Sequence, residues 1–154
     1  MATYDLIGDA YDLVYPDTIG RVPFVKDLLK RHGKDSVLEL GIGTGLFAIP
    51  LHEAGVDIEG LEISQVMIDL VGQKVPGLKV HKGDMRTYTI NRRYGAIIAL
   101  SSVLVFVNTE DEIKQCLERC YIHLKSKGIL LLELPNHAVE IGRSNNSQEL
   151  HCNE

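Results

Sequence analysis

The chain has 154 residues, of which 45% are hydrophobic and 24% charged, and this composition indicates one globular domain rather than a disordered chain. Sixteen Lys and Arg against 21 Asp and Glu give a formal net charge of −5, so we expect no binding to nucleic acid or to an anionic membrane surface. No window approaches the roughly twenty apolar residues of a membrane-spanning helix. Three cysteines favour a reducing compartment, and the acidic N-terminal stretch is unlike a secretion signal, so the sequence predicts a cytoplasmic protein.

The first third of the chain predicts two helices and a buried strand. Residues 3–15 have a roughly helical apolar spacing, which Gly8 weakens. Residues 24–29 place apolar side chains on one face of a second helix, which Gly33 closes. The short apolar segment Ser36–Leu40 then predicts a strand.

The middle of the chain continues the alternation. A helix should follow the glycines at positions 41–45 and end before Gly55, with a kink or a late start at Pro50. Ser64 is a candidate N-cap, and Thr109 with Glu112 forms a candidate capping box. The remaining predicted elements are a strand at Val56–Leu61, a helix after Ser64 that carries Val66, Met67, Leu70 and Val71, strands at Leu78–His81 and Gly95–Leu100, a helix from residue 110 to about Leu124 that stops at residues 126–128, and a strand at Ile129–Leu134.

Strands that alternate with helices and are apolar on both faces predict an α/β fold with a parallel sheet covered by helices on both sides. We expect this domain to occupy residues 1–140. Residues 141–154 are polar and low in apolar content, so we expect them to form a disordered tail outside the fold.

A glycine-rich turn follows the first predicted strand, in Val37–Phe47 (VLELGIGTGLF). Gly41 and Gly43 would let a ligand approach the backbone closely. The dinucleotide pattern needs a glycine where Leu46 stands, and Glu39 would repel a pyrophosphate. A cationic ligand without phosphate resolves this conflict. S-adenosylmethionine is such a ligand, and Glu39 would attract it directly or through water.

Two further acids follow the next two strands. Glu62 ends the second predicted strand and could accept both hydroxyls of a ribose. Asp84 follows the third strand and could accept an adenine amino group, while Met85 and Ile63 pack against the ring faces. Each acid alone is more often a solvated loop residue. One acid after each of three successive strands is a much more specific pattern.

The ordered segments VLELGIGTG, LEIS, GDM and ILLLEL resemble the motifs of class I S-adenosylmethionine-dependent methyltransferases. YDLVY, HKGDMR and SSV are similar to segments of the small-molecule type, among them amino-sugar N-methyltransferases. The resemblance implies a Rossmann-like sheet of order 3-2-1-4-5 and methyl transfer to a small-molecule acceptor on nitrogen or oxygen, with S-adenosylhomocysteine as product. It assigns the cofactor to Glu39, Gly41, Gly43, Glu62, Ile63, Asp84 and Met85, with Tyr11 or Tyr15 closing over the methionine end and Leu100 and Ser101 lining the site.

The family sheet has two more strands than this sequence can supply after Leu134. We therefore expect the fifth strand to lie at a sheet edge, where it could pair with a second copy of the chain. An alternative function is a cofactor-binding fragment or partner subunit that does not catalyse transfer. A nicotinamide oxidoreductase is disfavoured by Leu46 and Glu39.

Two other features of the sequence could carry chemistry. Cys116, Cys120 and His123 share one predicted helix face, but a second cluster to complete a metal site is missing, so we expect no metal. His137 follows the fifth strand and could act as a general base, although a surface loop histidine is the more common case.

Overall fold

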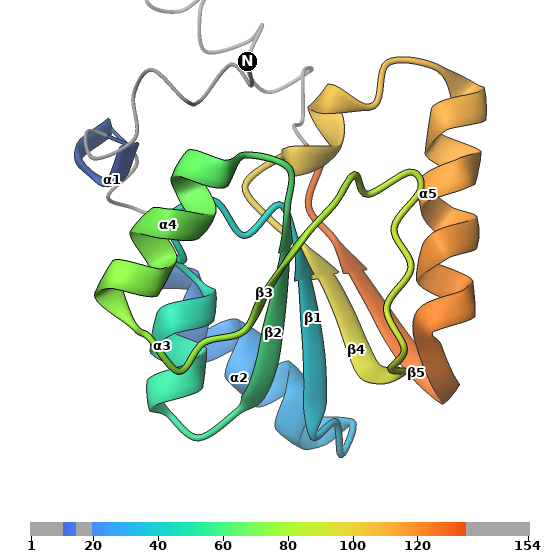
Figure 1. The fold of residues 1–154 in the computed structure, drawn as a ribbon. Helices are drawn as coiled ribbons and strands as arrows, with labels where there is room; N and C mark the ends of the chain where they lie inside the picture. Colours follow the sequence, from blue (N-terminus) through green and yellow to red (C-terminus); the bar gives the residue numbers. More distant parts are fainter. Residues whose placement is uncertain (1–10, 15–19, 135–154) are drawn as a thin grey trace, which may run out of the picture.

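The computed structural model describes residues 11–14 and 20–134 (Figure 1). The boundary expected between residues 140 and 141 lies outside this range. None of the described helices has the length and apolar content needed to cross a membrane. The elements in chain order are α1 Tyr11–Val14, α2 Val22–Arg31, β1 Ser36–Leu40, α3 Ala48–Glu53, β2 Asp57–Glu62, α4 Gln65–Lys74, β3 Val80–Lys82, β4 Tyr94–Ala99, the 3₁₀ helix η4 Val103–Phe106, α5 Glu110–His123 and β5 Leu124–Leu132.

The five strands form one parallel sheet in the order β3-β2-β1-β4-β5, which confirms the predicted fold class (Figure 1). Strand β1 lies at the centre, where Val37 is in register with Ile58 of β2 and with Ala96 of β4. All five residues of β1 are buried, as expected for a strand with neighbours on both sides and helices on both faces. The chain order reverses on either side of β1, so ligands are expected at its carboxyl end.

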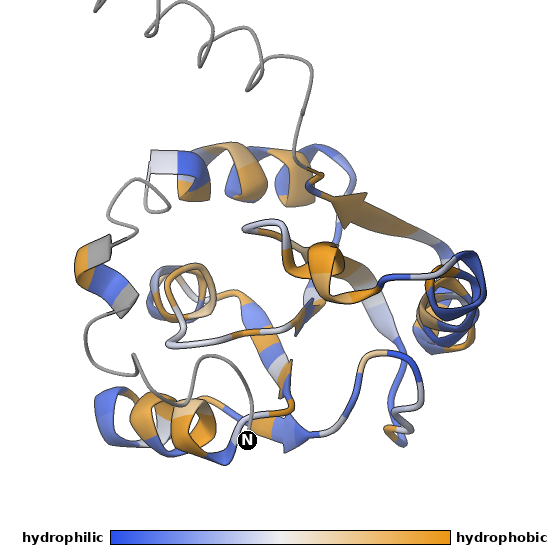
Figure 2. Cartoon of the chain, turned by 90° about the horizontal axis from the view of Figure 1, so that it is seen from above, coloured by the Kyte–Doolittle hydropathy of each residue, from blue (hydrophilic) through white to orange (hydrophobic). Residues whose placement is uncertain are grey.

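Two apolar cores lie on opposite faces of this sheet. Helices α2, α3 and α4 pack against Val37, Ile58 and Ile98 on one face. Helix α5 and the segment after β3 pack against Leu38 and Ile97 on the other face. Figure 2 shows the sheet between these helices, viewed from above. Because neighbouring residues of a strand point to opposite faces, each buried strand contributes to both cores.

The predicted helix starts agree with the structure. Ser64 caps α4, since its Oγ accepts a hydrogen bond from the Met67 N–H at 3.3 Å. Thr109 caps α5 in the same way, accepting from the Glu112 N–H at 3.2 Å. Helix α3 starts late, at Ala48, which places Pro50 in its first turn. A proline is tolerated there because the first N–H groups of a helix have no partner within it.

The fifth strand differs from the prediction. It begins at Leu124, directly after α5, rather than at Ile129. Its register jumps from Tyr94↔Leu124 to Ala96↔Ile129, so the intervening residues form a bulge. Lys127 in this bulge has a left-handed backbone, with φ of 59°. The turn-forming sequence Ser126-Lys127-Gly128 therefore interrupts the strand instead of preceding it.

Strand β5 is the last strand of the sheet in the part of the chain that the structure describes. Residues 129–132 are half-buried, whereas the residues of β4 are all buried. In the described part of the chain, residues 129–132 therefore lie at the edge of the sheet, as predicted for residues 129–134.

A buried carboxylate in β2 joins two parts of the sheet. Glu59 is 6% exposed and accepts hydrogen bonds from Tyr94 Oη at 2.7 Å and His81 Nε2 at 2.6 Å, and it pairs with Arg92. Burial opposes ionisation, but these bonds outweigh it and lower the pKa of Glu59 to about 2. Arg92 also pairs with Asp57.

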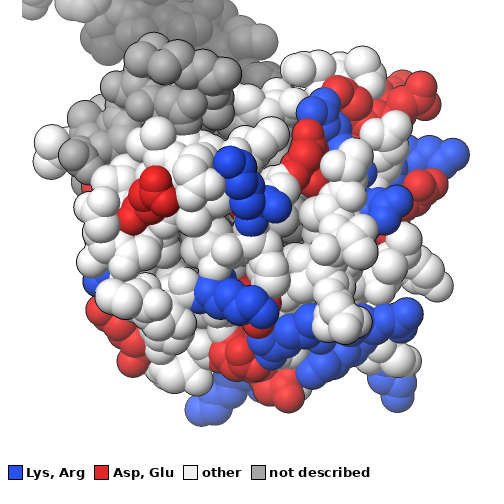
Figure 3. All heavy atoms as spheres, viewed as in Figure 1, with Lys and Arg blue, Asp and Glu red and all other residues white. Residues whose placement is uncertain are grey.

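Charged side chains of both signs lie close together on the surface. Basic side chains gather towards the lower part of the face in Figure 3, with acidic side chains beside them.

Candidate functional site

A cavity of about 280 Å³ lies at the carboxyl end of the sheet. Its walls come from the glycine turn after β1, the ends of β2 and β4, the loop after β3, helix α4 and the segment that contains η4. The lining residues are Gly41, Gly43, Leu61, Glu62, Ile63, Ser64, Met67, Gly83, Asp84, Met85, Arg86, Leu100, Ser101, Val103, Phe106 and Val107. The structure thus brings together eight of the eleven residues predicted for the site.

The two glycines of the turn after β1 that line the cavity have different roles. Gly41 and Gly43 both have left-handed backbones, with φ of 65° and 55°. A Cβ at Gly41 would lie 2.2 Å from Val103 Cγ2, so this glycine lets η4 pack against the turn. A Cβ at Gly43 would meet no atom within 4 Å. Gly43 therefore leaves open space in which a ligand can reach the backbone.

Glu62 fastens the glycine turn to the end of β2. Its Oε2 accepts the Gly43 N–H at 3.0 Å, and its Oε1 accepts the N–H groups of Ile63 at 2.8 Å and Ser64 at 2.9 Å. A carboxylate offers about four acceptor positions. Three of these are taken, so about one remains for a ligand hydroxyl without rearrangement. For Glu62 to accept both ribose hydroxyls, as predicted, its hydrogen bond from the Gly43 N–H would have to break.

Glu39 of β1 is buried and is absent from the cavity lining. Its side chain is 3% exposed, and its Oε2 has no hydrogen-bond partner in the described part of the chain. Burial raises the pKa of Glu39 to about 8, and the nearby charge of Glu62 adds to this rise, against the Ala48 backbone N–H, which lowers it. Glu39 is thus mainly neutral at pH 7. Its direct contact with a ligand stays a prediction.

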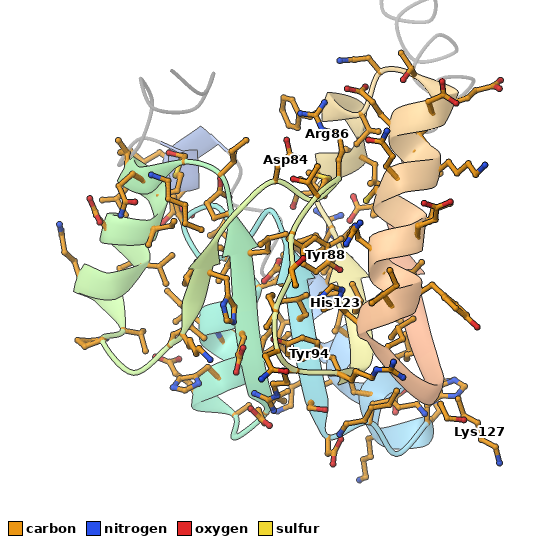
Figure 4. The ribbon with its side chains drawn as sticks, turned by 45° about the vertical axis from the view of Figure 1, so that its right-hand side comes forward. Asp84, Arg86, Tyr88, Tyr94, His123 and Lys127 are labelled. Carbon is orange, nitrogen blue, oxygen red and sulfur yellow. The ribbon has the colours of Figure 1, made fainter. Side chains whose placement is uncertain are left out.

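Asp84 and Arg86 form the polar end of the loop after β3 (Figure 4). Asp84 Oδ1 accepts the Arg86 backbone N–H at 2.8 Å and Arg86 Nε at 2.9 Å. Arg86 Nη2 donates to Asp84 Oδ2 at 2.5 Å. The guanidinium lowers the pKa of Asp84 below its usual value, although partial burial opposes this. The neighbouring Met85 and the 54% exposed Ile63 line the same cavity, as predicted for the walls of a flat ring.

The cavity wall after β4 has an uncommon backbone. Ser101 and Ser102 both adopt left-handed conformations, with φ of 52° and 56°. A non-glycine residue in such a conformation costs on the order of 1–3 kcal/mol and often marks a functional site. The Ser101 N–H donates to Glu133 Oε2 at 3.2 Å, which holds this corner to the end of β5. Leu100 and Ser101 both line the cavity, as the resemblance implied.

The N-terminal predictions lie at the margin of the described structure. Tyr11 begins α1, but its side chain lies outside the described atoms, and Tyr15 and His137 lie outside the described residues. Asp12 of α1 is described. Its Oδ1 accepts a hydrogen bond from Thr44 Oγ1 at 2.5 Å, and its Oδ2 pairs with Lys74 Nζ at 2.6 Å. Helix α1 is therefore attached to the glycine turn and to α4.

The residues weighed for a metal have other roles. Cys116 and Cys120 are buried in the core under α5. His123 Nδ1 lies 2.7 Å from the Arg119 carbonyl oxygen, to which it donates, and Nε2 accepts the Ile90 N–H at 3.0 Å. The ring also lies 4.5 Å from the Tyr88 ring (Figure 4). Both ring nitrogens of His123 thus make hydrogen bonds to the backbone.

Sequence reasoning missed two features of the site. It did not identify Arg86 as a cavity residue, although an arginine two positions after Asp84 is a recognisable signal for a local ion pair. It also missed the contacts of Asp12 with Thr44 and Lys74. These residues are 32 and 62 positions away from Asp12, and no local pattern relates them.

Comparison with known proteins identifies the family. Residues 37–128 match the model of the methyltransferase domain, and the chain belongs to this family. It is 29% identical over 133 residues to dTDP-3-amino-3,6-dideoxy-alpha-D-glucopyranose N,N-dimethyltransferase of Streptomyces fradiae, covering 82% of the chain and 52% of that protein. It is 26% identical over 132 residues to dTDP-3-amino-3,4,6-trideoxy-alpha-D-glucopyranose N,N-dimethyltransferase of Streptomyces venezuelae, covering 82% and 56%.

Solved structures agree with this assignment. The crystal structure of DesVI from Streptomyces venezuelae matches with a TM-score of 0.77 and 26% identity, covering 82% of this chain and 56% of that one. CalS10, an amino pentose methyltransferase from Micromonospora echinaspora solved with bound S-adenosylmethionine, matches with a TM-score of 0.76 and 25% identity, covering 85% and 56%. The chain has the Rossmann-like fold of these methyltransferases and spans about half the length of the relatives it matches.

Proposed function

We propose that the cavity binds S-adenosylmethionine and its product S-adenosylhomocysteine, and that the chain is the cofactor-binding domain of a small-molecule methyltransferase. One observation carries this proposal. Carboxylates from the ends of two neighbouring strands, Glu62 and Asp84, line the same cavity as the open glycine turn at Gly43. Carboxylates beside a glycine turn disfavour phosphate and favour a ligand that carries cationic groups.

The residues present fit such a cofactor. Gly43 leaves space for it at the backbone, and Glu62 keeps an acceptor position for a ribose hydroxyl. Asp84 faces the position proposed for the adenine amino group, with Ile63 and Met85 packing against the ring. The cofactor supplies a methyl group activated by a positively charged sulfur. The protein contributes orientation and exclusion of water, which together account for large rate effects when a reactive donor is held beside its acceptor.

The acceptor is a small molecule with an amine. This part of the proposal rests on the relatives, whose names describe N,N-dimethyltransferases of dTDP-linked amino sugars. Residues after β4, Leu100 and Ser101, would separate the cofactor from the acceptor, and Tyr11 or Tyr15 would cover the methionine end. Methylation of nitrogen is favoured over oxygen on the same ground.

Calorimetry tests the cofactor proposal directly. The chain should bind S-adenosylmethionine and S-adenosylhomocysteine with measurable heat, and NAD should give none. Tight binding of NAD, or no binding of S-adenosylhomocysteine, would overturn the proposal. A methyl-transfer assay against amine and hydroxyl acceptors then separates an active enzyme from a cofactor-binding unit without catalysis.

We also propose a cellular compartment and an oligomeric state for this protein. The buried free thiols of Cys116 and Cys120 support a reducing compartment, and we place the protein in the cytoplasm. The β5 edge at residues 129–132 supports self-association of two copies, since it pairs with β4 alone in the described sheet.

A further inference from the structure

Arg86 connects the loop after β3, which lines the cavity, to the start of α5. On one side its guanidinium and backbone N–H hold the Asp84 carboxylate. On the other side its Nη1 pairs with Glu112 in the first turn of α5. Figure 4 shows Asp84 and Arg86 close together at the upper end of the molecule, beside the start of α5. The bridge therefore runs from the loop after β3 to the element that follows η4.

Glu112 is itself fixed by the chain around the start of α5. Its Oε2 accepts the Asn108 N–H at 2.9 Å, and its own N–H donates to the Thr109 side chain. Phe106 and Val107, which come shortly before this turn in the chain, line the same cavity as Asp84. The Glu112 carboxylate therefore links Arg86 to the backbone at Asn108, next to this part of the cavity wall.

The bonds from Arg86 also determine what Asp84 can still bind. Three donors reach its carboxylate: the backbone N–H, Nε and Nη2, with Nε at 2.9 and 3.1 Å from the two oxygens. Out of about four acceptor positions, about one remains. An ionised carboxylate has no hydrogen to donate, so this position accepts an N–H or O–H group and repels a carbonyl oxygen.

We propose that Arg86 is a positioning residue that sets the base selectivity of the cavity, by fixing the orientation of the Asp84 carboxylate so that its remaining acceptor position takes a 6-amino purine and rejects a 6-oxo purine. The proposal rests on the proposed function, because it assigns the Asp84 end of the cavity to the purine. The Arg86–Glu112 bridge adds that the same arginine is paired with the start of α5, which follows the η4 segment of the cavity wall. Without Arg86 the Asp84 carboxylate loses the side-chain bonds that fix its orientation, so it no longer offers one fixed acceptor position and the discrimination would be lost.

The test compares two ligands that differ in one group. S-adenosylhomocysteine and its 6-oxo analogue, S-inosylhomocysteine, are titrated into the wild-type chain, Arg86→Met and Arg86→Lys. Wild type should prefer the 6-amino ligand by at least tenfold. Arg86→Met should reduce this ratio to threefold or less. Arg86→Lys should give an intermediate ratio, since lysine keeps the charge but lacks the planar fork of the guanidinium.

Arg92→Met is the matched control, because Arg92 pairs with Asp57 and Glu59 outside the cavity and its loss should leave the ratio unchanged. Glu112→Gln tests the bridge, since it should weaken both ligands by a similar factor and leave their ratio intact. A wild-type ratio retained in Arg86→Met would overturn the inference. If Arg86→Met does not fold, a wild-type ratio in Arg86→Lys would overturn it in the same way. Failure of the wild-type chain to bind S-adenosylhomocysteine would instead overturn the proposed function.

Discussion

Asp12 of α1 accepts a hydrogen bond from Thr44 of the glycine turn at 2.5 Å, and the same carboxylate pairs with Lys74 at the end of α4. Lys74 also donates to the Thr44 carbonyl oxygen at 3.2 Å. Three segments that are distant in the sequence therefore meet at one point beside the cavity. This contact holds α1 next to the glycine turn that lines the cavity.

Replacing Asp12 by Asn should weaken ligand binding. The amide keeps the shape of the side chain but loses the charge that pairs with Lys74, so α1 is held less firmly beside the glycine turn. We expect affinity for S-adenosylhomocysteine to fall about three- to tenfold in calorimetry. Asp27→Asn, which removes a surface pair with Arg31 on α2, is the control and should have no effect. Equal affinities of the two variants would argue against the contact.

Glu62 should matter for both binding and stability. In Glu62→Ala, three backbone N–H groups lose their acceptor, and a hydrogen bond to a charged group is worth roughly 1.5–3 kcal/mol. We expect at least a tenfold loss of affinity for S-adenosylhomocysteine and a lower melting temperature. Glu62→Gln keeps one carbonyl oxygen and should lie between wild type and Ala on both measurements. An unchanged dissociation constant in Glu62→Ala would refute a role in binding.

The buried Glu39 should make stability fall with rising pH. Its pKa is raised from the ordinary value of 4.5 to about 8 in the folded chain, so between these two pH values the folded state holds a proton that the unfolded state has lost. Stability should therefore decrease as pH rises from 4.5 to 8, by roughly 3–5 kcal/mol in total. Glu39→Gln, which is neutral at every pH, should remove most of this decrease in denaturant titrations. A parallel pH dependence in both proteins would contradict the assignment.

The sheet edge should lead to concentration-dependent association. Unpaired backbone groups of an exposed strand edge can pair with a second chain, and residues 129–132 carry no charge or proline to prevent it. Light scattering should show a rising average mass between about 10 μM and 1 mM. Leu134→Lys, at a position that is 64% exposed, adds a charge beside the edge and should lower that mass. A strict monomer over the whole range would refute the prediction.

The sheet could be predicted from the sequence because its central strands are continuous apolar runs. Ser36–Leu40 was predicted with both bounds as observed, and Ser64 was identified as a cap from its position before an apolar helix. The start of β5 was wrong because Ser126-Lys127-Gly128 has the composition of a loop. The strand begins at Leu124 only because this residue pairs with Tyr94 of β4, and a local sequence pattern does not show such pairing.

The site was predictable where one residue type at a strand end has a chemical meaning. Glu62, Asp84 and the glycines were found in this way and line the cavity. Glu39 satisfied the same pattern, but its side chain is buried and is not among the residues that line the cavity, so its contact with a ligand stays a prediction. Arg86 and Asp12 were missed because their roles depend on partners in other elements.

The two left-handed serines after β4 have a consequence for attempts to engineer this protein. Glycine adopts such conformations without strain, so Ser101→Gly or Ser102→Gly would relieve a local cost at a wall of the cavity. The same exchange would let that wall sample more conformations. A screen that selects for heat resistance alone would therefore favour changes at this corner that trade affinity for stability. The left-handed backbone of Ser101 and Ser102 thus lowers the stability of the fold and at the same time restricts this cavity wall to one conformation.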